Sequence, residues 1–369
     1  MRVPFVDLSH QSEPPLREQI LAAWAAILDE GQFVGGPRID AFETAFAALI
    51  GGSYCAAVSD GTAALRLSLQ ALEVKPGDEV IVPANTFIAT VEAVSHCGAI
   101  PVFVDCRADT LNIDSGVVEA AITSRTVGIV PVHLYGQPAD MDAIQAIAAR
   151  HKLWLLEDAA QAHLATYKGR TAGTLGDAAA FSFYPSKNLG APGEGGAVVT
   201  RHADLAARVK KLRDHGSSAK YVHDVIGENA RMSTLVAAAL NLKLSHLRAW
   251  TERRRSAARM YLAALATMPT VKAPVVPAWA EPAWHLFVVH VANRDAVKTA
   301  LERAHVGVGL HYPRPVHLQK AYSHLGVKPG SMPQAEASAA SCLSLPMHPS
   351  LTPADVAYVI DALRGAVRI

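Results

Sequence analysis

Cysteine is scarce in this sequence, which contains only four, at positions 55, 97, 106 and 342. No two of them have the C-x-x-C spacing typical of redox and metal sites. The chain begins Met1-Arg2-Val3-Pro4, without the charged and then apolar segment of a secretory signal. Together these features predict a protein of the reducing cytoplasm.

An excess of charge of one sign is also missing, since 34 Lys and Arg stand against 33 Asp and Glu. This balance gives no reason to expect a nucleic-acid partner. The basic run Arg253-Arg254-Arg255 is expected to lie on the solvated face of a helix. No uninterrupted apolar stretch approaches the roughly 18 residues of a membrane span, so no membrane association is expected.

What the sequence does contain is an alternation of short apolar runs and longer segments with helical spacing. The expected strands are "EVIVPA" from Glu79, "IPVFVDC" from Ile100, "TVGIVPVHLYG" from Thr126, "KLWLLEDAA" from Lys152, "AAFSFYP" from Ala179 and "GGAVVT" from Gly195. The expected helices follow Gly61, Thr86 and Pro138. Such alternation is typical of an α/β fold whose strands are covered by helices on both faces.

A length of 369 residues suggests a large domain with a smaller companion. One long helical stretch is expected from Thr234 to the Pro-rich segment "MPTVKAPVVPAWAEP". We place the boundary within this region, giving a large domain of residues 1–250 and a smaller α+β domain of residues 251–369. The expected strands of the smaller domain are "WHLFVVHV" and "VGVGLHY".

Two residues on neighbouring expected strands suggest covalent chemistry. Asp158 ends the "KLWLL" run, and the C-terminal ends of such strands form the crevice where open α/β sheets bind ligands. Asp158 is equally compatible with a helix N-cap. Lys187 lies between "AAFSFYP" and a run of glycines, where apolar surroundings would lower the pKa of its amine. A buried amine facing a carboxylate suits pyridoxal 5'-phosphate, whose ring acts as an electron sink. A surface lysine is the ordinary alternative.

Two further features match the same cofactor. Gly61 and Thr62 in "VSDGTAALRL" open a helix whose free N–H groups suit a phosphate, although Asp60 and Thr62 could simply cap that helix. Phe87 in "PANTFIAT" could stack on a ring, or belong to the core.

The segments "SDGTAAL", "GDEVIVPANTFIATVEA", "EDAAQAH", "GDAAAFSFYPSKNLGAPGEGGAVVT", "NARMS" and "HYPRPVHLQ" occur in this order. In this pattern the sequence resembles the DegT/DnrJ/EryC1/StrS family of nucleotide-sugar aminotransferases, over nearly the whole chain. The resemblance implies an α/β fold of the aspartate-aminotransferase type (fold type I), with a mixed sheet in the large domain. It also implies a homodimer with shared active sites.

By this resemblance Lys187 forms the imine with the cofactor, Asp158 pairs with the pyridine nitrogen and Gln161 contacts the 3-hydroxyl. Gly61, Thr62 and Ser182 would contact the phosphate and Phe87 would stack on the ring. Asn229 in "GENARMS" would reach the phosphate of the neighbouring subunit.

The chain departs from the family pattern at a few positions. Ala63 replaces a common acid just after the phosphate loop, and Ser233 and Val236 replace an acid and a glutamine near the subunit interface. These changes bear on local hydrogen bonds and leave the lysine in place.

The resemblance implies a ping-pong reaction from glutamate to a nucleotide-linked keto-sugar, with Lys187 moving the proton. Three alternatives to the sugar-aminotransferase function stay open. A non-catalytic regulator and a 3-dehydrase of the same fold both tend to lack the lysine that is present here. The third alternative is a nucleotide-binding module with "GEGG" as its phosphate loop, but this segment lacks the glycine spacing of the known phosphate-binding motifs.

The position of the amino group is the last expectation. Tyr184, three residues before Lys187, is similar to the tyrosine of family members that act at C-3, which predicts a 3-keto-6-deoxyhexose substrate and a 3-amino sugar. A 4-keto sugar is the alternative. His311, Tyr312 and His317 are expected near the sugar, or else pack the small domain against the large one.

Overall fold

The computed structural model describes residues 1–368. At its centre is a seven-stranded sheet with the strand order β1-β9-β8-β5-β4-β2-β3. The strands are β1 (Tyr54–Val58), β2 (Glu79–Pro83), β3 (Ile100–Val104), β4 (Thr126–Ile129), β5 (Trp154–Asp158), β8 (Ala178–Ser182) and β9 (Gly196–Thr200). Strand β9 runs antiparallel to both of its neighbours, while the other pairings are parallel, so the sheet is mixed as predicted.

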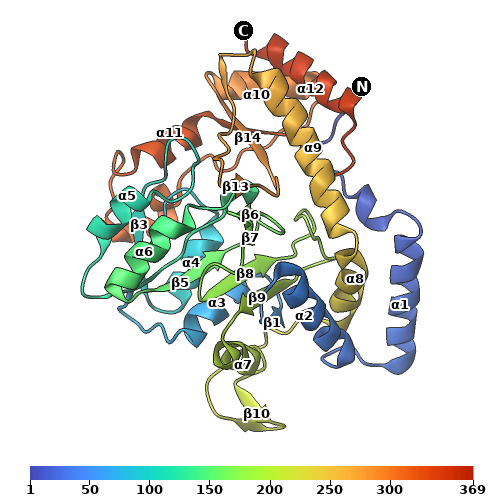
Figure 1. Cartoon of the computed structure of the whole chain (residues 1–369), viewed down its shortest axis with the longest axis vertical. Helices are drawn as coiled ribbons and strands as arrows, with labels where there is room; N and C mark the ends of the chain where they lie inside the picture. Colours follow the sequence, from blue (N-terminus) through green and yellow to red (C-terminus); the bar gives the residue numbers. More distant parts are fainter. Residues whose placement is uncertain (369) are drawn as a thin grey trace.

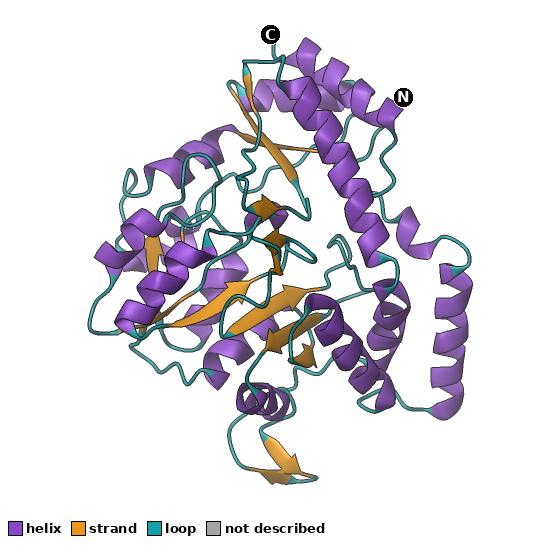
Figure 2. Cartoon of the chain, viewed as in Figure 1, coloured by secondary structure: helices purple, strands orange, loops and turns teal. Residues whose placement is uncertain are grey.

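Helices cover both faces of this sheet, as Figure 2 shows. Their apolar side chains pack on strand residues that alternate between the faces, such as Val80 and Val82 on one side and Ile81 on the other. One face is covered by α3 (Gly61–Ala71), α4 (Ile88–His96) and α7 (Ala203–Leu212). The other is covered by α2 (Pro37–Ile50), α6 (Met141–His151) and α8 (Thr234–Leu244). This arrangement confirms the predicted α/β class.

A second core gathers the C-terminal part of the chain. Its three-stranded sheet has the order β12-β14-β15 and packs against three helices. These elements are β12 (Val271–Lys272), β14 (Phe287–Val291), β15 (Cys342–Leu345), α9 (Leu247–Leu265), α10 (Arg294–Arg303) and α12 (Pro353–Ala366). Val3 belongs to this core too and pairs with Val306, so the first residues of the chain lie with the C-terminal unit (Figure 1).

Two expectations for the C-terminal part need correction. The long helical stretch from Thr234 is two helices, because α8 ends at Leu244 and α9 begins at Leu247. The segment "VGVGLHY" forms only isolated bridges, at Val306 and Gly309, and the strand beside β14 is β15 instead. The proposed domain boundary at residue 250 falls inside α9, so one continuous helix joins the two units. The two-domain division remains our proposal.

The basic run on α9 is also not uniformly solvated. Arg254 is only 3% exposed and lies among the buried polar residues, whereas Arg253 points outward. Since residues three and four positions apart share a helix face, Arg254 continues the buried stripe of Trp250, Ala257 and Ala258. The groups around the buried guanidinium must therefore offset the free-energy cost of burying its charge.

The remaining elements extend from these cores. They are α1 (Leu16–Glu30), α5 (Ser115–Val118), α11 (Pro333–Ser341), the sheet of β6 (Thr166–Tyr167), β7 (Arg170–Thr171) and β13 (Ala280–Glu281), the hairpin of β10 (Ser217–Ala219) and β11 (Val222–His223), and the 3₁₀ turns Ser9–Ser12, Glu119–Ala121, Leu134–Gly136, Val316–Leu318 and Lys320–Leu325. The β10–β11 hairpin projects from the lower end of the molecule in Figure 1. Within residues 1–368, no helix combines the length and apolar character needed to span a membrane.

Candidate active site

A cavity of about 590 Å³ lies at the C-terminal ends of β1, β5 and β8, which point the same way in the sheet. This is the edge at which open α/β sheets bind ligands. All but two of the residues predicted for the site line the cavity: Gly61, Thr62, Phe87, Asp158, Gln161, Ser182, Tyr184, Lys187, His311 and Tyr312.

Lys187 lies in the turn after β8, where its backbone N–H donates to the Tyr184 carbonyl over 2.8 Å. Burial lowers the pKa of its amine to about 8, and the nearby Asp158 carboxylate partly opposes that shift. The amine therefore loses its proton far more readily than an exposed lysine does. This is the state that a nucleophilic amine requires.

The carboxylate of Asp158, at the end of β5, is held by two donors. Oδ2 accepts the Thr90 hydroxyl over 2.7 Å, and Oδ1 accepts the Ala160 N–H over 3.1 Å. A turn rather than a helix follows Asp158, so it is not a helix N-cap. Its side chain is buried and fixed at the floor of the cavity.

Gln161 is oriented through both ends of its amide. Oε1 accepts the Tyr135 N–H over 2.6 Å, and Nε2 donates to the Tyr312 hydroxyl over 3.1 Å. Tyr135 in turn donates its hydroxyl to the His311 carbonyl, and the His311 ring bonds the Ser344 hydroxyl over 2.8 Å. A chain of hydrogen bonds thus connects the turn after β5 of the large sheet to β15 of the small one.

The start of α3 forms the opposite end of the cavity. Asp60 caps this helix by accepting the Ala63 N–H over 2.8 Å, which confirms the capping interpretation for Asp60. The N–H groups of Gly61 and Thr62 have no acceptor in the part of the chain that the structure describes. Gly61 lies so close to Ser182 that an added Cβ would be 2.7 Å from the Ser182 Cβ. Two free donors and a hydroxyl therefore converge at one point.

Two aromatic side chains stand at the mouth of the cavity. Phe87 is 52% exposed and Tyr184 is 50% exposed, so neither is a core residue in this chain. The Phe87 ring centroid lies 5.6 Å from that of Tyr312. Both rings are free to contact a ligand on one side.

Two predicted residues do not line this cavity. His317 is buried against Phe103, and its Nε2 lies 3.1 Å from Glu336 Oε1, so in this chain it packs the C-terminal segment on the large sheet. Asn229 is exposed next to the β10–β11 hairpin and forms an isolated backbone β-bridge with Asp214. Its predicted contact is with a neighbouring subunit, which a single chain does not test.

Several lining or supporting residues escaped the sequence reasoning. Thr90 holds Asp158 from the first turn of α4, and Glu194 and His285 line the cavity. Burial, together with the charges of Lys187 and Arg254, lowers the pKa of His285 well below its ordinary value, so this imidazole is neutral. The sequence offered a reason to consider Thr90, because it lies one helical turn after Thr86. No feature of the sequence around His285 indicates a functional role.

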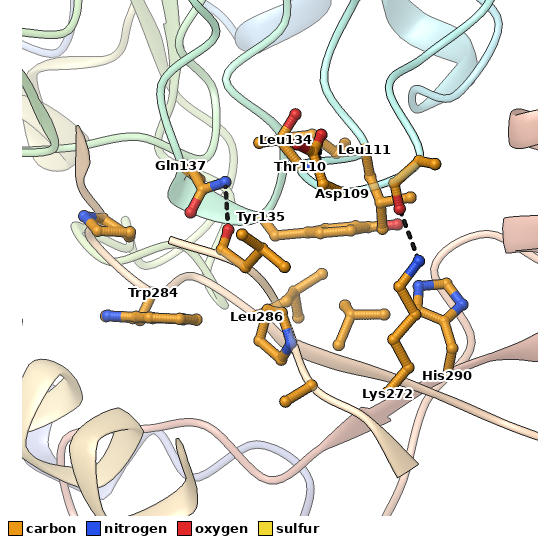
Figure 3. A pocket seen from close by; sticks show the side chains of 16 residues that line it. Asp109, Thr110, Leu111, Leu134, Tyr135, Gln137, Lys272, Trp284, Leu286 and His290 are labelled. Carbon is orange, nitrogen blue, oxygen red and sulfur yellow. Dashed lines mark hydrogen bonds between the residues drawn. The ribbon is translucent and has the colours of Figure 1, made fainter. Parts of the chain in front are cut away.

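A second and smaller cavity lies between the two units (Figure 3). Its walls are mainly apolar, with Tyr135 on one side and Trp284 and Leu286 on the other. Gln137 Nε2 donates to the Val275 carbonyl over 3.1 Å and Lys272 Nζ to the Ala108 carbonyl over 2.7 Å, which ties the units together around it. Its volume of about 30 Å³ leaves room for little more than water, so it is not a substrate site.

Residues 14–364 match the DegT/DnrJ/EryC1/StrS aminotransferase family. The chain belongs to that family. The match confirms the resemblance drawn from the sequence, and it covers both units of this DegT/DnrJ/EryC1/StrS protein.

Two relatives and one solved structure show how close the similarity is. The chain is 49% identical to the erythromycin biosynthesis sensory transduction protein EryC1 of Saccharopolyspora erythraea, over 99% of this chain and 100% of that one. It is 46% identical to the dTDP-3-amino-3,4,6-trideoxy-alpha-D-glucose transaminase of Streptomyces venezuelae, over 98% and 96%. The structure of S. venezuelae DesV in complex with a ketimine intermediate matches with a TM-score of 0.97 at 46% identity, over 100% and 99%. The predicted aspartate-aminotransferase-type fold is confirmed by this match.

Proposed function

We propose that this protein is a pyridoxal-phosphate aminotransferase that moves an amino group from glutamate to a nucleotide-linked 3-keto-6-deoxyhexose. The observation that carries the proposal is Lys187, whose amine has a lowered pKa and faces Asp158 in the main cavity. A regulator without catalysis, as the name of the EryC1 relative could suggest, would have no need for this arrangement.

The cavity fits pyridoxal phosphate at each of its functional groups. The free N–H groups of Gly61 and Thr62 and the hydroxyl of Ser182 suit the phosphate at the positive end of α3. Asp158 would hold the ring nitrogen and Phe87 would cover one face of the ring. When bound, the cofactor supplies an electron sink for the carbon that loses its proton.

The chain's own groups then divide the remaining work. The Lys187 amine, partly neutral near neutral pH, is able to take a proton from the α-carbon of the donor and return it to the carbon on the other side of the donor nitrogen. Asp158 stays in place because Thr90 and Ala160 hold both of its oxygens. The acid–base chemistry is thereby separated from the fixed negative charge that orients the cofactor.

For the sugar we propose contacts from Tyr184, His311 and Tyr312. The Tyr312 hydroxyl already bonds Gln161, and the His311 ring already bonds Ser344, so both are oriented in advance. No hydrogen bond from the Tyr184 hydroxyl is found within residues 1–368, which leaves this group free for a hexose hydroxyl. The name of the S. venezuelae transaminase, which specifies a 3-amino sugar, supports amination at C-3.

A panel of nucleotide-linked 3-keto and 4-keto sugars, supplied with glutamate and followed by mass spectrometry, tests this function. We expect a 3-amino sugar from the parent protein and no product from Lys187→Ala. Tyr184→Phe should lower the rate without loss of cofactor, by about 5- to 150-fold for a lost hydrogen bond to a buried polar group. Conversion of 4-keto sugars with the 3-keto isomers left untouched would contradict the proposed position.

We also propose that the active unit is a homodimer in which Asn229 completes the phosphate site of the other chain. Support comes from the projecting hairpin region, where Tyr221, Val222, Val225 and Ile226 are exposed, Ile226 to 98%. Ultracentrifugation should show two chains or a multiple of two. Ile226→Glu should shift the mass toward one chain, whereas a fully active monomer would contradict the proposal.

A further inference from the structure

Arg254 is a buried cation that has no carboxylate partner within residues 1–368. Its Nη1 donates to the carbonyls of Trp284, His285 and Met347 over 3.2, 3.3 and 2.8 Å. Its Nε is buried with no partner, and Nη2 donates to no acceptor in the described chain. Burial lowers the pKa of the guanidinium to about 9, which still leaves it charged at neutral pH.

Arg254 lines a small cavity beside the active site. The side cavity holds about 60 Å³, and Arg254 lines it together with Asp7 and residues of the N-terminal segment. It shares Ser186, His285 and His311 with the main cavity. Because Ser186 directly precedes Lys187, the side cavity adjoins the reactive amine.

Other charged groups do not neutralise Arg254. The acid that lines the side cavity is Asp7, but its carboxylate accepts the Ser9 N–H over 2.8 Å and forms no ion pair with Arg254 in the described part of the chain. His285 and His311 are neutral, because burial and the charge of Lys187 lower the pKa of each. A buried charge with unused donors is costly unless an anion completes the site.

We propose that Arg254 binds the α-carboxylate of the amino donor in this side cavity. The inference rests on the proposed aminotransferase function. The α-carboxylate of any amino acid lies two covalent bonds from the nitrogen that takes the place of the Lys187 amine. It must therefore bind close to the lysine turn, and Arg254 is the fixed cation there among the described residues that line the two cavities. The free Nη2 donor of this fixed guanidinium suits a charge-assisted hydrogen bond to a carboxylate oxygen.

Binding of 2-methylglutamate tests this assignment, because it carries both carboxylates but has no α-hydrogen and so is not consumed. Calorimetry on the cofactor-loaded protein should show its Kd raised by about 10- to 100-fold in Arg254→Gln, the ratio for a lost hydrogen bond to a charged group. Arg255→Gln is the matched control. That neighbouring arginine also bonds carbonyls, of Pro282 and Leu164, but does not line the side cavity. Its Kd should match that of the parent.

A second pair of variants leaves Arg254 and its carbonyl contacts intact, in case Arg254→Gln does not fold. Val6 lines the side cavity, so Val6→Asp adds a competing carboxylate that Val6→Asn of nearly equal size does not. We expect weaker 2-methylglutamate binding in the aspartate variant alone. Equal affinities within the Val6 pair, or parent-like affinity in a folded Arg254→Gln, would overturn the proposal and place the cation elsewhere, for example on a partner subunit.

The two proposals fail separately. The parent protein loaded with pyridoxamine phosphate meets the keto-sugar without any amino acid, so that half-reaction tests the proposed acceptor independently of the donor carboxylate. If the parent binds 2-methylglutamate through Arg254 but aminates none of the sugars, only the proposed acceptor is wrong.

Discussion

Gly61→Ala is the change whose effect follows most directly from the structure. The added methyl group would lie 2.7 Å from the Ser182 Cβ and 3.3 Å from its Cα, whereas carbon atoms pack best at about 3.5–4.0 Å. Ser182 cannot move aside easily, because it ends β8, which is paired with β5 on one side and β9 on the other. Overpacking of this kind costs about 1–3 kcal/mol.

The cost can appear in two measurable quantities. If α3 stays in place, the free energy of unfolding in urea falls by about 1–3 kcal/mol. If the start of α3 moves away, the two proposed phosphate contacts separate, and the Kd for pyridoxal phosphate rises by about 5- to 150-fold. Spectrophotometric titration of the cofactor measures the second effect. We expect the two losses together to exceed about 1 kcal/mol.

A matched control is available at Gly365 in α12, where an added Cβ meets nothing within 4 Å. Gly365→Ala should stabilise the protein by about 0.5–1 kcal/mol, because alanine is the better helix former. A Gly61→Ala protein with the stability and cofactor affinity of the parent would refute the close-approach argument.

Two other changes test the reactive pair. Asp158→Asn keeps the size of the side chain but removes its charge, so stopped-flow absorbance should show the α-proton step slowed by several orders of magnitude; a loss under about tenfold, or 1.4 kcal/mol of barrier, would limit Asp158 to a structural role. Burying the Lys187 charge costs stability below its pKa of about 8, and this cost disappears as pH rises to the ordinary value of 10.5. In the cofactor-free protein, Lys187→Met should therefore exceed the parent in unfolding free energy most near pH 7 and least above 10.5, and a pH-independent difference would contradict the lowered pKa.

The sequence predicted the strands and the residues at their ends well, because a strand covered on both faces is a short apolar run whose final residue enters the ligand crevice. Asp158 and Lys187 were found in this way, whereas Ser182 was expected from the family resemblance. The strand β1 was missed because its sequence "YCAAV" is short and its central side chains are small. The strand β15 was missed because its partner β14 is distant in sequence. The interior position of Arg254 was missed because a run of three arginines indicates solvent, whereas the rotation of α9 decides each residue separately.

The residues that join elements were beyond local reasoning. Thr90 and Asp158 are 68 positions apart, and Tyr135 and His311 are 176 apart. No periodicity connects such pairs, since only the completed fold brings them together. The glutamate donor, the cytoplasmic location and the role of Asn229 stay predictions.

The antiparallel strand β9 has a consequence for how the protein is synthesised. Strand β1, which leads into α3, has β9 as its neighbour in the sheet, from Tyr54 with Thr200 to Val58 with Gly196, and its only other pairing in the described chain is the isolated bridge of Val58 with Arg231. The phosphate end of the site therefore lacks its support until about 140 further residues have left the ribosome. Those residues include the turn that carries Lys187, since it connects β8 to β9. Closure of this loop is entropically costly and sets a late step in folding. A nascent chain that ends before β9 lacks the strand that pairs with β1, so the site is not assembled. The turn that carries Lys187 and the phosphate donors at the start of α3 therefore reach their final positions in the same folding step.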